Sequence, residues 1–234
     1  MNPLLNHPGY LIQTSQQAHS LDTYLVKRMG HAYQQFCASW DKLLPDPYLR
    51  DGGHYRLRRY SVFNWQSGRL TLLPHEPHYQ SGYHNKLHGG FNRHFRPWLP
   101  TTIQNPALLE MIRWCVKQFS RSSTQLWRIQ AHQFRIRTSA KEQGKPTPEG
   151  VHKDGADYIL IMMINRQNIS GGQSLIYDNQ RQALEAYTLE QRGDLMLIND
   201  QKIYHGVTPV TPTNPNQVAW RDVLVLTFHR FKKQ

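Results

Sequence analysis

Residues 152–164 read HKDGADYILIMMI, and this stretch decides the fold. Its first part is polar and contains Gly155, which is typical of a turn. Its second part, Tyr158–Ile164, is a continuous apolar run with the length and composition of a buried strand. A polar turn that leads into a buried strand predicts a layered β fold in this half of the chain.

The pattern of short strands extends over the rest of the second half of the chain. Turn signals such as Gly171-Gly172 and Gly193-Asp194 recur at intervals of about ten residues. The expected strands are Trp127–Arg137, Tyr158–Ile164, Gln173–Tyr177, Ala186–Leu189, Leu195–Asn199, Gly206–Val210 and Val223–Phe228. This series predicts a mainly β sandwich or jelly-roll barrel with helices packed outside it.

The first half of the chain carries the helices. Apolar residues recur at steps of three, four and seven over residues 20–44, and a second helix is expected over residues 106–120, with Asn105 as its N-cap. Between these helices lie two shorter strand-like runs, Tyr55–Phe63 and Arg69–Leu73.

No break in composition separates the two halves. We therefore expect a single domain over residues 1–234. Residues 1–125 would form its helical and supporting region, and residues 126–234 would supply the core jelly-roll strands with the functional site.

The composition excludes several classes of protein. The chain is 38% hydrophobic and 11% aromatic, which is enough apolar material for a core and excludes a disordered chain or a coiled coil. No apolar run is long enough to span a bilayer. The first residues lack the basic start and apolar stretch of a signal peptide, and the two cysteines form no CxxC motif. These features predict a cytoplasmic protein without a membrane partner or a cysteine-based zinc site.

The positive charge is the other unusual feature of the composition. The chain carries 28 Lys and Arg residues against 16 Asp and Glu residues, a net charge of +12. Residues 1–100 contribute +6 and residues 101–234 contribute +6, so the excess is spread along the chain. An evenly spread excess is more typical of a solvated surface than of a nucleic-acid-binding stripe. A nucleic-acid partner is therefore disfavoured, and steering of small acidic ligands is expected instead.

Five histidines lie close together in a stretch rich in proline and glycine. They are separated by 3, 6, 4 and 6 positions and lack the second half of any zinc pattern: His75, His78, His84, His88 and His94. We expect them to be neutral loop histidines or contacts at the mouth of a cleft.

A candidate metal site lies at the start of the buried strand. In an extended segment His152 and Asp154 point to the same side, because residues i and i+2 share a face. His205 precedes a later expected strand. Two imidazoles and one carboxylate on one side of a metal are the ligand set of non-haem Fe(II) oxygenases. The rival carboxylate Asp157 has the wrong spacing to share that face, and the rival histidine His229 has no partner carboxylate in the pattern.

Arg221 opens the last expected strand, where alternation turns its side chain inward. A buried guanidinium needs an anion, and its planar fork fits a carboxylate with two parallel hydrogen bonds. An acid that binds the metal at one end and Arg221 at the other would satisfy both sites.

At these residues the chain resembles the Fe(II)- and 2-oxoglutarate-dependent dioxygenases, and within them the bacterial branch of free-amino-acid hydroxylases that includes the L-isoleucine 4-hydroxylases. The matching stretches are His132–Ile136, Pro146–Gly155, Gly171–Ser174, Gly193-Asp194, His205–Val210 and Arg221-Asp222. The match is good over residues 125–230, and it is looser at Tyr55–Phe63 and Gly89-Gly90.

The resemblance implies a double-stranded β-helix core and a set of site residues. By position, His152, Asp154 and His205 would bind Fe(II), and Arg221 would hold the far carboxylate of 2-oxoglutarate. The implied reaction consumes 2-oxoglutarate and O2, hydroxylates a small substrate such as a free L-amino acid, and releases succinate and CO2. No catalytic residue beyond the metal centre is implied.

The resemblance is least informative about the substrate pocket. It singles out His132 and Arg135 as candidates for binding the substrate. The cluster Arg56, Arg58 and Arg59 could also contribute, although an exposed cluster on an edge strand is the commoner arrangement.

One position departs from the family pattern. Val223 stands where many members of the superfamily have a Ser or Thr that shares the 2-oxoglutarate carboxylate. The second hydrogen bond would then come from Thr227, a tyrosine or water.

Two other classes of function stay open on the sequence. One is an oxygenase of the same superfamily directed at a nucleic acid or a protein, which would need a basic groove that leads to His152. The other is a non-catalytic jelly-roll protein that keeps a metal. The complete His, Asp, His and Arg set argues against that second reading.

Overall fold

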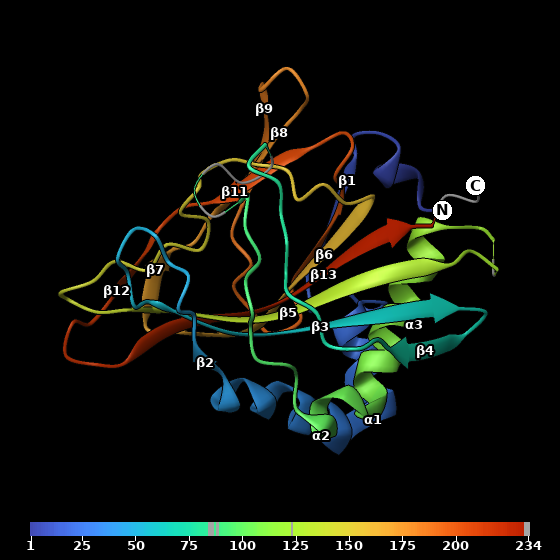
Figure 1. The fold of residues 1–234 in the computed structure, drawn as a ribbon, viewed down its shortest axis with the longest axis horizontal. Coiled ribbons are helices and arrows are strands. Elements are labelled where there is room, and N and C mark those ends of the chain that lie inside the picture. Colours follow the sequence, from blue (N-terminus) through green and yellow to red (C-terminus); the bar gives the residue numbers. More distant parts are fainter. Residues whose placement is uncertain (84–86, 88, 123, 232–234) are drawn as a thin grey trace.

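The computed structural model describes residues 1–83, 87, 89–122 and 124–231, and its centre is a large antiparallel sheet (Figure 1). The sheet has eight strands, seven of them in the order β1-β10-β6-β13-β5-β3-β2, with β4 paired to β3. Their bounds are β1 Tyr10–Gln13, β2 Leu44–Pro45, β3 Arg56–Gln66, β4 Arg69–Leu72, β5 Trp127–Thr138, β6 Tyr158–Gln167, β10 Leu195–Asn199 and β13 Ala219–Arg230.

Two smaller sheets form the second layer. One has the order β11-β8-β9, with β8 Ser174–Tyr177, β9 Ala183–Tyr187 and β11 Tyr204–Val207. The other pairs β7 Ile169–Gly171 with β12 Val210–Pro212. Ile176 of β8 packs in one hydrophobic cluster with Ile159 and Ile161 of β6, so the smaller sheet closes over one face of the large sheet. The predicted mainly β, jelly-roll architecture is confirmed.

The helices cover the other face of the large sheet, as Figure 1 shows for α1 and α3. The helices are α1 Leu21–Ala38, α2 Pro100–Ile103 and α3 Pro106–Phe119, with short 3-10 turns at Pro3–Leu5 and Ser39–Lys42. The side chains of Ser20 and Asn105 accept hydrogen bonds from backbone N–H groups in the first turns of α1 and α3. Among the helices that the structure describes, none is long and apolar enough to cross a membrane.

Alternation along the strands separates a helix-facing side from a cavity-facing side. On β13, Leu224 and Leu226 pack in the same cluster as Phe36 of α1 and Ile112 of α3. Val223 packs in the cluster between the sheets. Because successive side chains of a strand point to opposite faces, Arg221 lies on the same face as Val223.

The structure corrects some boundaries of the expected elements. The first helix ends at Ala38 and continues as a 3-10 turn, so it does not run on to residue 44. The expected strand Gly206–Val210 is divided between β11 and β12, which belong to different sheets. The first strand, β1, was not expected, and it pairs with β10 at the edge of the large sheet.

Candidate metal centre and cavity

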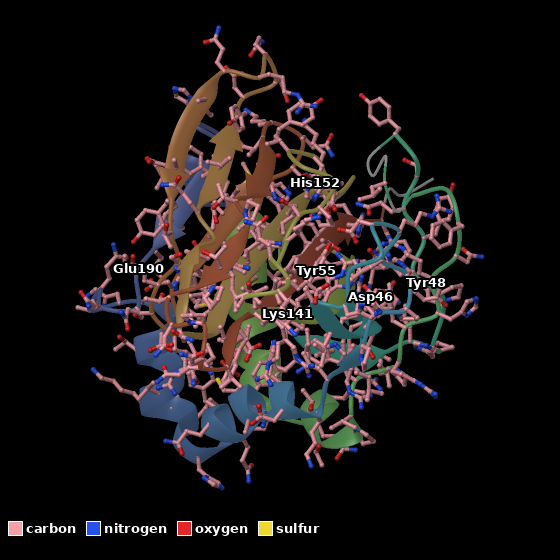
Figure 2. All side chains as sticks on the ribbon, turned by 90° about the vertical axis from the view of Figure 1, so that its left-hand side faces the viewer. Asp46, Tyr48, Tyr55, Lys141, His152 and Glu190 are labelled. Carbon is pink, nitrogen blue, oxygen red and sulfur yellow. The ribbon has the colours of Figure 1, made fainter. Side chains whose placement is uncertain are left out.

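The inner face of the large sheet borders a cavity of about 410 Å³. Inward-facing residues of β3, β5 and β13 form much of its wall. Residues of the loop between β4 and α2 and of the loop between β5 and β6 also contribute to it. The lining includes Arg56, Arg58, His78, Arg93, Gln130, His132, Phe134, Ile136, Glu149, His152, Asp154, His205, Arg221, Val223, Val225, Thr227 and His229. In Figure 2 the labelled His152 lies well above the helices, which are at the bottom of that view.

Backbone pairing holds the two candidate histidine ligands side by side. His152 and His205 form an antiparallel bridge in which each N–H donates to the other's carbonyl over 2.9 Å. His205 lies in β11 and is also paired with Ile176 of β8. Two histidines 53 positions apart in the sequence therefore have fixed relative positions.

The predicted carboxylate lies between them. The Asp154 carboxylate oxygens are 3.5 Å from Nε2 of His152 and 3.5 Å from Nε2 of His205. One ligand atom from each of the three residues can be chosen so that all lie within 4.8 Å of one another. The structure thus brings together the three residues that the sequence proposed as metal ligands.

The turn at Asp154 is held in place by a buried carboxylate that the sequence did not reveal. Asp200 is fully buried and accepts the backbone N–H groups of Asp154, Gly155 and Ala156 over 3.2, 2.7 and 2.9 Å. Gly155 has a φ of 80°, a conformation that side-chain-bearing residues rarely adopt. The turn therefore requires both a glycine and an acceptor beneath it. The only sequence signal for Asp200 is its place directly after the apolar run Leu195–Asn199.

The electrostatics of the three residues fit a divalent cation. His152 Nδ1 donates to the carbonyl of Gly150 over 3.0 Å, which directs Nε2 toward Asp154. Burial lowers the pKa of His152, but Asp154 and Glu149 outweigh it and raise the pKa to about 10. Burial likewise opposes the charge of Asp154, yet the two imidazoles hold its pKa well below the usual range. A cation would take the place of the proton that the raised pKa leaves on His152.

One buried atom at the site also indicates that these residues bind a cation. Among the residues that the structure describes, Nε2 of His205 is buried and has no hydrogen-bond partner. An imidazole nitrogen left in this state is costly unless a ligand engages it. Two imidazoles and a carboxylate are also donors that Fe(II) accepts, so the residues present fit the metal.

Arg221 projects into the same cavity from β13. It is 2% exposed, and its Nε and Nη2 have no hydrogen-bond partner within the described part of the chain. Burial, together with the neighbouring guanidinium of Arg166, lowers the pKa of Arg221 to about 10. Gly172 gives room here, since a Cβ at this residue would lie 3.1 Å from Arg166 Nη1 and 3.6 Å from Arg221 Cδ. The two neighbouring guanidiniums and the unpaired donors of Arg221 favour an anion at this end of the cavity.

Thr227 is too far from Arg221 to bind the same carboxylate. Both residues line the cavity from β13, but they are six positions apart, about 20 Å along a strand. Val223 occupies the position two residues after Arg221 and offers no hydrogen-bonding group. The suggestion that Thr227 supplies the second hydrogen bond is therefore not supported by the strand geometry.

The two residues expected in the substrate pocket lie on opposite faces of β5. His132 lines the cavity, where its Nδ1 accepts from Nη2 of Arg58 over 2.7 Å. Arg135 is not part of the lining. It points to the helix side, where it forms ion pairs with Asp222 at 2.7 Å and Asp41 at 2.9 Å. The physical reason is the odd spacing from His132, which reverses the direction of the side chain.

The Arg56, Arg58 and Arg59 cluster is divided in the same way. Arg56 and Arg58 are 6% and 4% exposed and line the cavity, so the expectation of an exposed cluster is wrong for these two residues. Arg59 points the other way and donates to the carbonyls of Lys42 and Pro97. The i, i+2 spacing within a strand was a signal that could have identified the pair.

Residues from the histidine-rich stretch also reach the cavity. His78 is buried in its wall, and a short antiparallel bridge joins it to Arg93. His75 and His94 are exposed, in agreement with loop histidines, and His84 and His88 lie outside the described residues. Nothing in the sequence placed Arg93 at the site, because its position depends on that bridge between two loops.

The rival ligands are not part of the His152, Asp154 and His205 group. Asp157 accepts the backbone N–H of Arg230 over 2.8 Å. His229 lines the cavity, and burial lowers its pKa, so it is present as the neutral imidazole. No carboxylate is within ion-pair distance of His229 among the described residues.

A jelly-roll with this inward-facing ligand set and a buried arginine defines a class, the non-haem iron oxygenases. The chain belongs to the 2OG-Fe dioxygenase family, whose model matches residues 37–227. It is therefore an oxidoreductase of a family that uses Fe(II), 2-oxoglutarate and O2. This confirms the resemblance seen in the sequence.

Named relatives extend over most of the chain. It is similar to a 3(1)-hydroxy-L-isoleucine 4-dioxygenase of Pantoea ananatis, with 30% identity over 82% of this chain and 78% of the relative. It is also similar to an L-isoleucine-4-hydroxylase of Bacillus thuringiensis, with 26% identity over 75% of each chain. Among solved structures, a bsmA homolog from Methylobium petroleophilum superposes with a TM-score of 0.83 and 34% identity, covering 98% of this chain and 92% of the other.

Proposed function

We propose that the protein hydroxylates a free L-amino acid, with Fe(II) bound by His152, Asp154 and His205 and with Arg221 anchoring the far carboxylate of 2-oxoglutarate. The observation that carries the proposal is the shared cavity: the three clustered ligand atoms and the unpaired guanidinium nitrogens of Arg221 open into one space. The names of the two curated relatives support an amino acid as the substrate.

The chain's own residues would bind, orient and exclude water. Bound Fe(II) would supply the chemistry of oxidation by O2 coupled to the conversion of 2-oxoglutarate to succinate and CO2. The bridge between His152 and His205 and the hydrogen bonds to Asp200 would hold the ligands in place. Arg221 would fix the orientation of 2-oxoglutarate, and apolar residues such as Val223 and Val225 would keep water away from the reacting atoms.

The experiment that tests the proposal is an assay of succinate release. Purified protein is given Fe(II), ascorbate and 2-oxoglutarate, together with each of a panel of free L-amino acids. We expect at least one amino acid to stimulate succinate release and to yield a product heavier by one oxygen. If no amino acid stimulates turnover, and His152→Ala and Asp154→Ala variants behave like the wild type, the proposal is wrong.

We also propose that residues 1–234 unfold as one domain. Strands β1 and β3 from the first part of the chain pair with β10 and β5 of the core sheet, which supports a single cooperative unit. A single calorimetric transition, with equal calorimetric and van't Hoff enthalpies, is expected. Two separate transitions would contradict it.

A cytoplasmic location is proposed on the basis of the cysteines. Cys37 and Cys115 are both free thiols, which supports a reducing compartment. Fractionation of native cells with a specific antibody would test the location.

A further inference from the structure

Three guanidiniums gather in the wall of the cavity beside the candidate metal ligands. Arg56 and Arg58 come from β3, and Arg93 comes from the loop that precedes α2. All three line the cavity and are buried, with exposures of 6%, 4% and 2%. We refer to these three residues as the arginine cluster.

Among the residues that the structure describes, the arginine cluster carries more charge than the carboxylates beside it. The Asp46 carboxylate is 2.8 Å from Arg56 Nε and 3.7 Å from Arg58 Nη1. Burial would raise the pKa of Asp46, but Arg56 and Arg58 outweigh it and keep the pKa below the ordinary value. Glu149 is the second carboxylate on that side of the cavity, and its charge also acts on Arg93. Within the described part of the chain and apart from the candidate metal ligand Asp154, three cations thus face two anions.

The two histidines beside the cluster add no charge. Nδ1 of His132 accepts from Arg58 over 2.7 Å, and Nδ1 of His78 accepts from Arg93 over 2.8 Å. Burial, together with the charge of Arg58, holds the pKa of both histidines well below the ordinary value. Both rings are therefore neutral, and the net positive charge of the cluster remains.

Each arginine of the cluster keeps an unused donor. Across the described residues, Arg56 Nη2, Arg58 Nε and Arg93 Nε are buried without a hydrogen-bond partner. Buried donors and an excess buried charge cost free energy unless an anion engages them. The guanidinium of Arg58 also packs against two rings, 3.5 Å from the centre of Phe95 and 4.5 Å from that of Phe134. A guanidinium fixed in this way is pre-organised for a planar carboxylate.

The arginine cluster lies on the other side of β5 from Arg221. Arg56 and Arg221 are both register partners of Ile136, so they come from strands on either side of β5. Strands two places apart in a sheet are about 10 Å apart. Arg58 lies one inward position further along β3, opposite Phe134. Besides burial, the charged neighbours that shift the pKa of Arg221 are Arg166 and Asp222, whereas those of Arg58 are Asp46, Arg56 and Arg93, so the two arginines lie in different charge environments.

We propose that Arg56, Arg58 and Arg93 bind the free carboxylate of the substrate. The inference rests on the proposed function, in which 2-oxoglutarate occupies Arg221, and it adds a selection rule. The substrate must carry an ionised carboxylate, so a peptide-bound residue or a carboxamide is rejected. Rejection is strong because a ligand without the carboxylate leaves the buried guanidiniums unpaired.

The test compares free L-amino acids with their carboxamides. Binding is measured by calorimetry on iron-loaded protein with 2-oxoglutarate in the absence of O2, and turnover is measured in parallel as succinate release. We expect at least one amino acid to bind and its carboxamide to bind at least 100-fold more weakly. Equal affinities for the acid and the carboxamide, or no binding by any acid of the panel, would overturn the proposal.

Variants assign the effect to the cluster. Arg58→Gln and Arg93→Gln are each expected to weaken binding of the amino acid at least 10-fold without changing the affinity for 2-oxoglutarate, and Arg58→Lys should lie between Arg58→Gln and the wild type. The matched control is Arg59→Gln, on the same strand but outside the cavity lining. Unchanged amino-acid affinity in both glutamine variants would contradict the assignment, and use of two positions covers the case in which one variant does not fold.

The two readouts separate this inference from the proposed function. If a carboxamide stimulates succinate release to the same extent as its acid, the inference is overturned and the amino-acid hydroxylase is supported. Selective binding of acids without any succinate release would support the inference and overturn the hydroxylase.

Discussion

His152 and His205 exchange two backbone hydrogen bonds of 2.9 Å each, so the candidate metal ligands are fixed by main chain as well as by side chains. We expect His152→Ala to abolish stoichiometric iron binding and to reduce substrate-stimulated turnover at least about 100-fold, since one of three ligands is lost. Metal content after dialysis and succinate release measure the two effects. His229→Gln is the control, because His229 lines the same cavity outside the ligand group. Equal iron loss in both variants would contradict the assignment.

Asp200→Asn tests the support beneath Asp154. The amide has one oxygen in place of two and cannot accept all three N–H groups that Asp200 now accepts. We expect iron affinity to fall about 10- to 100-fold, as is usual when a group that orients a metal ligand is altered. Competition with a chelator measures the affinity. Asp157→Asn is the control, since the Asp157 carboxylate also accepts a backbone N–H but belongs neither to the cavity lining nor to the ligand group. The idea fails if the Asp200 variant keeps wild-type affinity.

Arg221→Gln should raise the KM for 2-oxoglutarate about 10- to 100-fold, the usual range for losing hydrogen bonds between charged groups. The KM for the amino acid should change little, because its carboxylate is assigned to the arginine cluster. Succinate release at varied 2-oxoglutarate concentration gives the value. Arg137→Gln, an exposed residue of β5, should behave as the wild type. A rise confined to the amino-acid KM would reverse the two assignments.

Arg135→Gln should affect stability and leave substrate binding unchanged. Asp222 is 1% exposed, and the substitution removes the guanidinium that pairs with it at 2.7 Å. Arg135 is itself 14% exposed, so we expect a loss of about 1–3 kcal/mol of unfolding free energy. Urea unfolding measures the loss. An increase in the KM for the amino acid with unchanged stability would restore Arg135 to the substrate pocket.

Stability should fall on acidification below about pH 6.5, the ordinary pKa of histidine. Burial and the nearby arginines hold the pKa of His78 and His132 well below that value in the folded protein. The unfolded chain therefore binds protons that the folded protein does not bind. As a result, the free energy of unfolding falls by up to about 1.4 kcal/mol per histidine for each pH unit. Urea unfolding at pH 7.5 and 5.5 should show a smaller difference in the free energy of unfolding between the two pH values in His132→Asn than in the wild type. An identical pH effect would contradict this.

The local pattern of apolar and polar residues predicted much of the architecture. The spacing of motif residues predicted several members of the candidate site. The apolar run Tyr158–Ile164 became the buried part of β6, and Asn105 caps α3 as its position indicated. The His152, Asp154 and His205 group was predictable because two of its members lie within three residues and the resemblance supplied the third. For Arg221, strand alternation alone gave the inward direction.

The rest of the site depends on contacts between distant segments. Arg93 reaches the cavity only because its loop pairs with that of His78, and Asp200 is recognisable only beneath the turn that it supports. Such contacts between distant segments leave no periodic pattern in the sequence. The assignment of Arg135 to the pocket shows the opposite error, in which a motif was carried over without counting the direction of each residue along the strand.

The excess of buried guanidiniums has a practical consequence for work on the purified protein. If Arg58 and Arg221 bind the two organic acids as proposed, small polyvalent anions such as sulfate and phosphate would compete for the same unpaired donors. Kinetic constants measured in phosphate buffer would then understate affinity for 2-oxoglutarate and for the amino acid. The same anions would raise the melting temperature by binding only the folded form. The choice of buffer salt is thus part of any quantitative study of this enzyme.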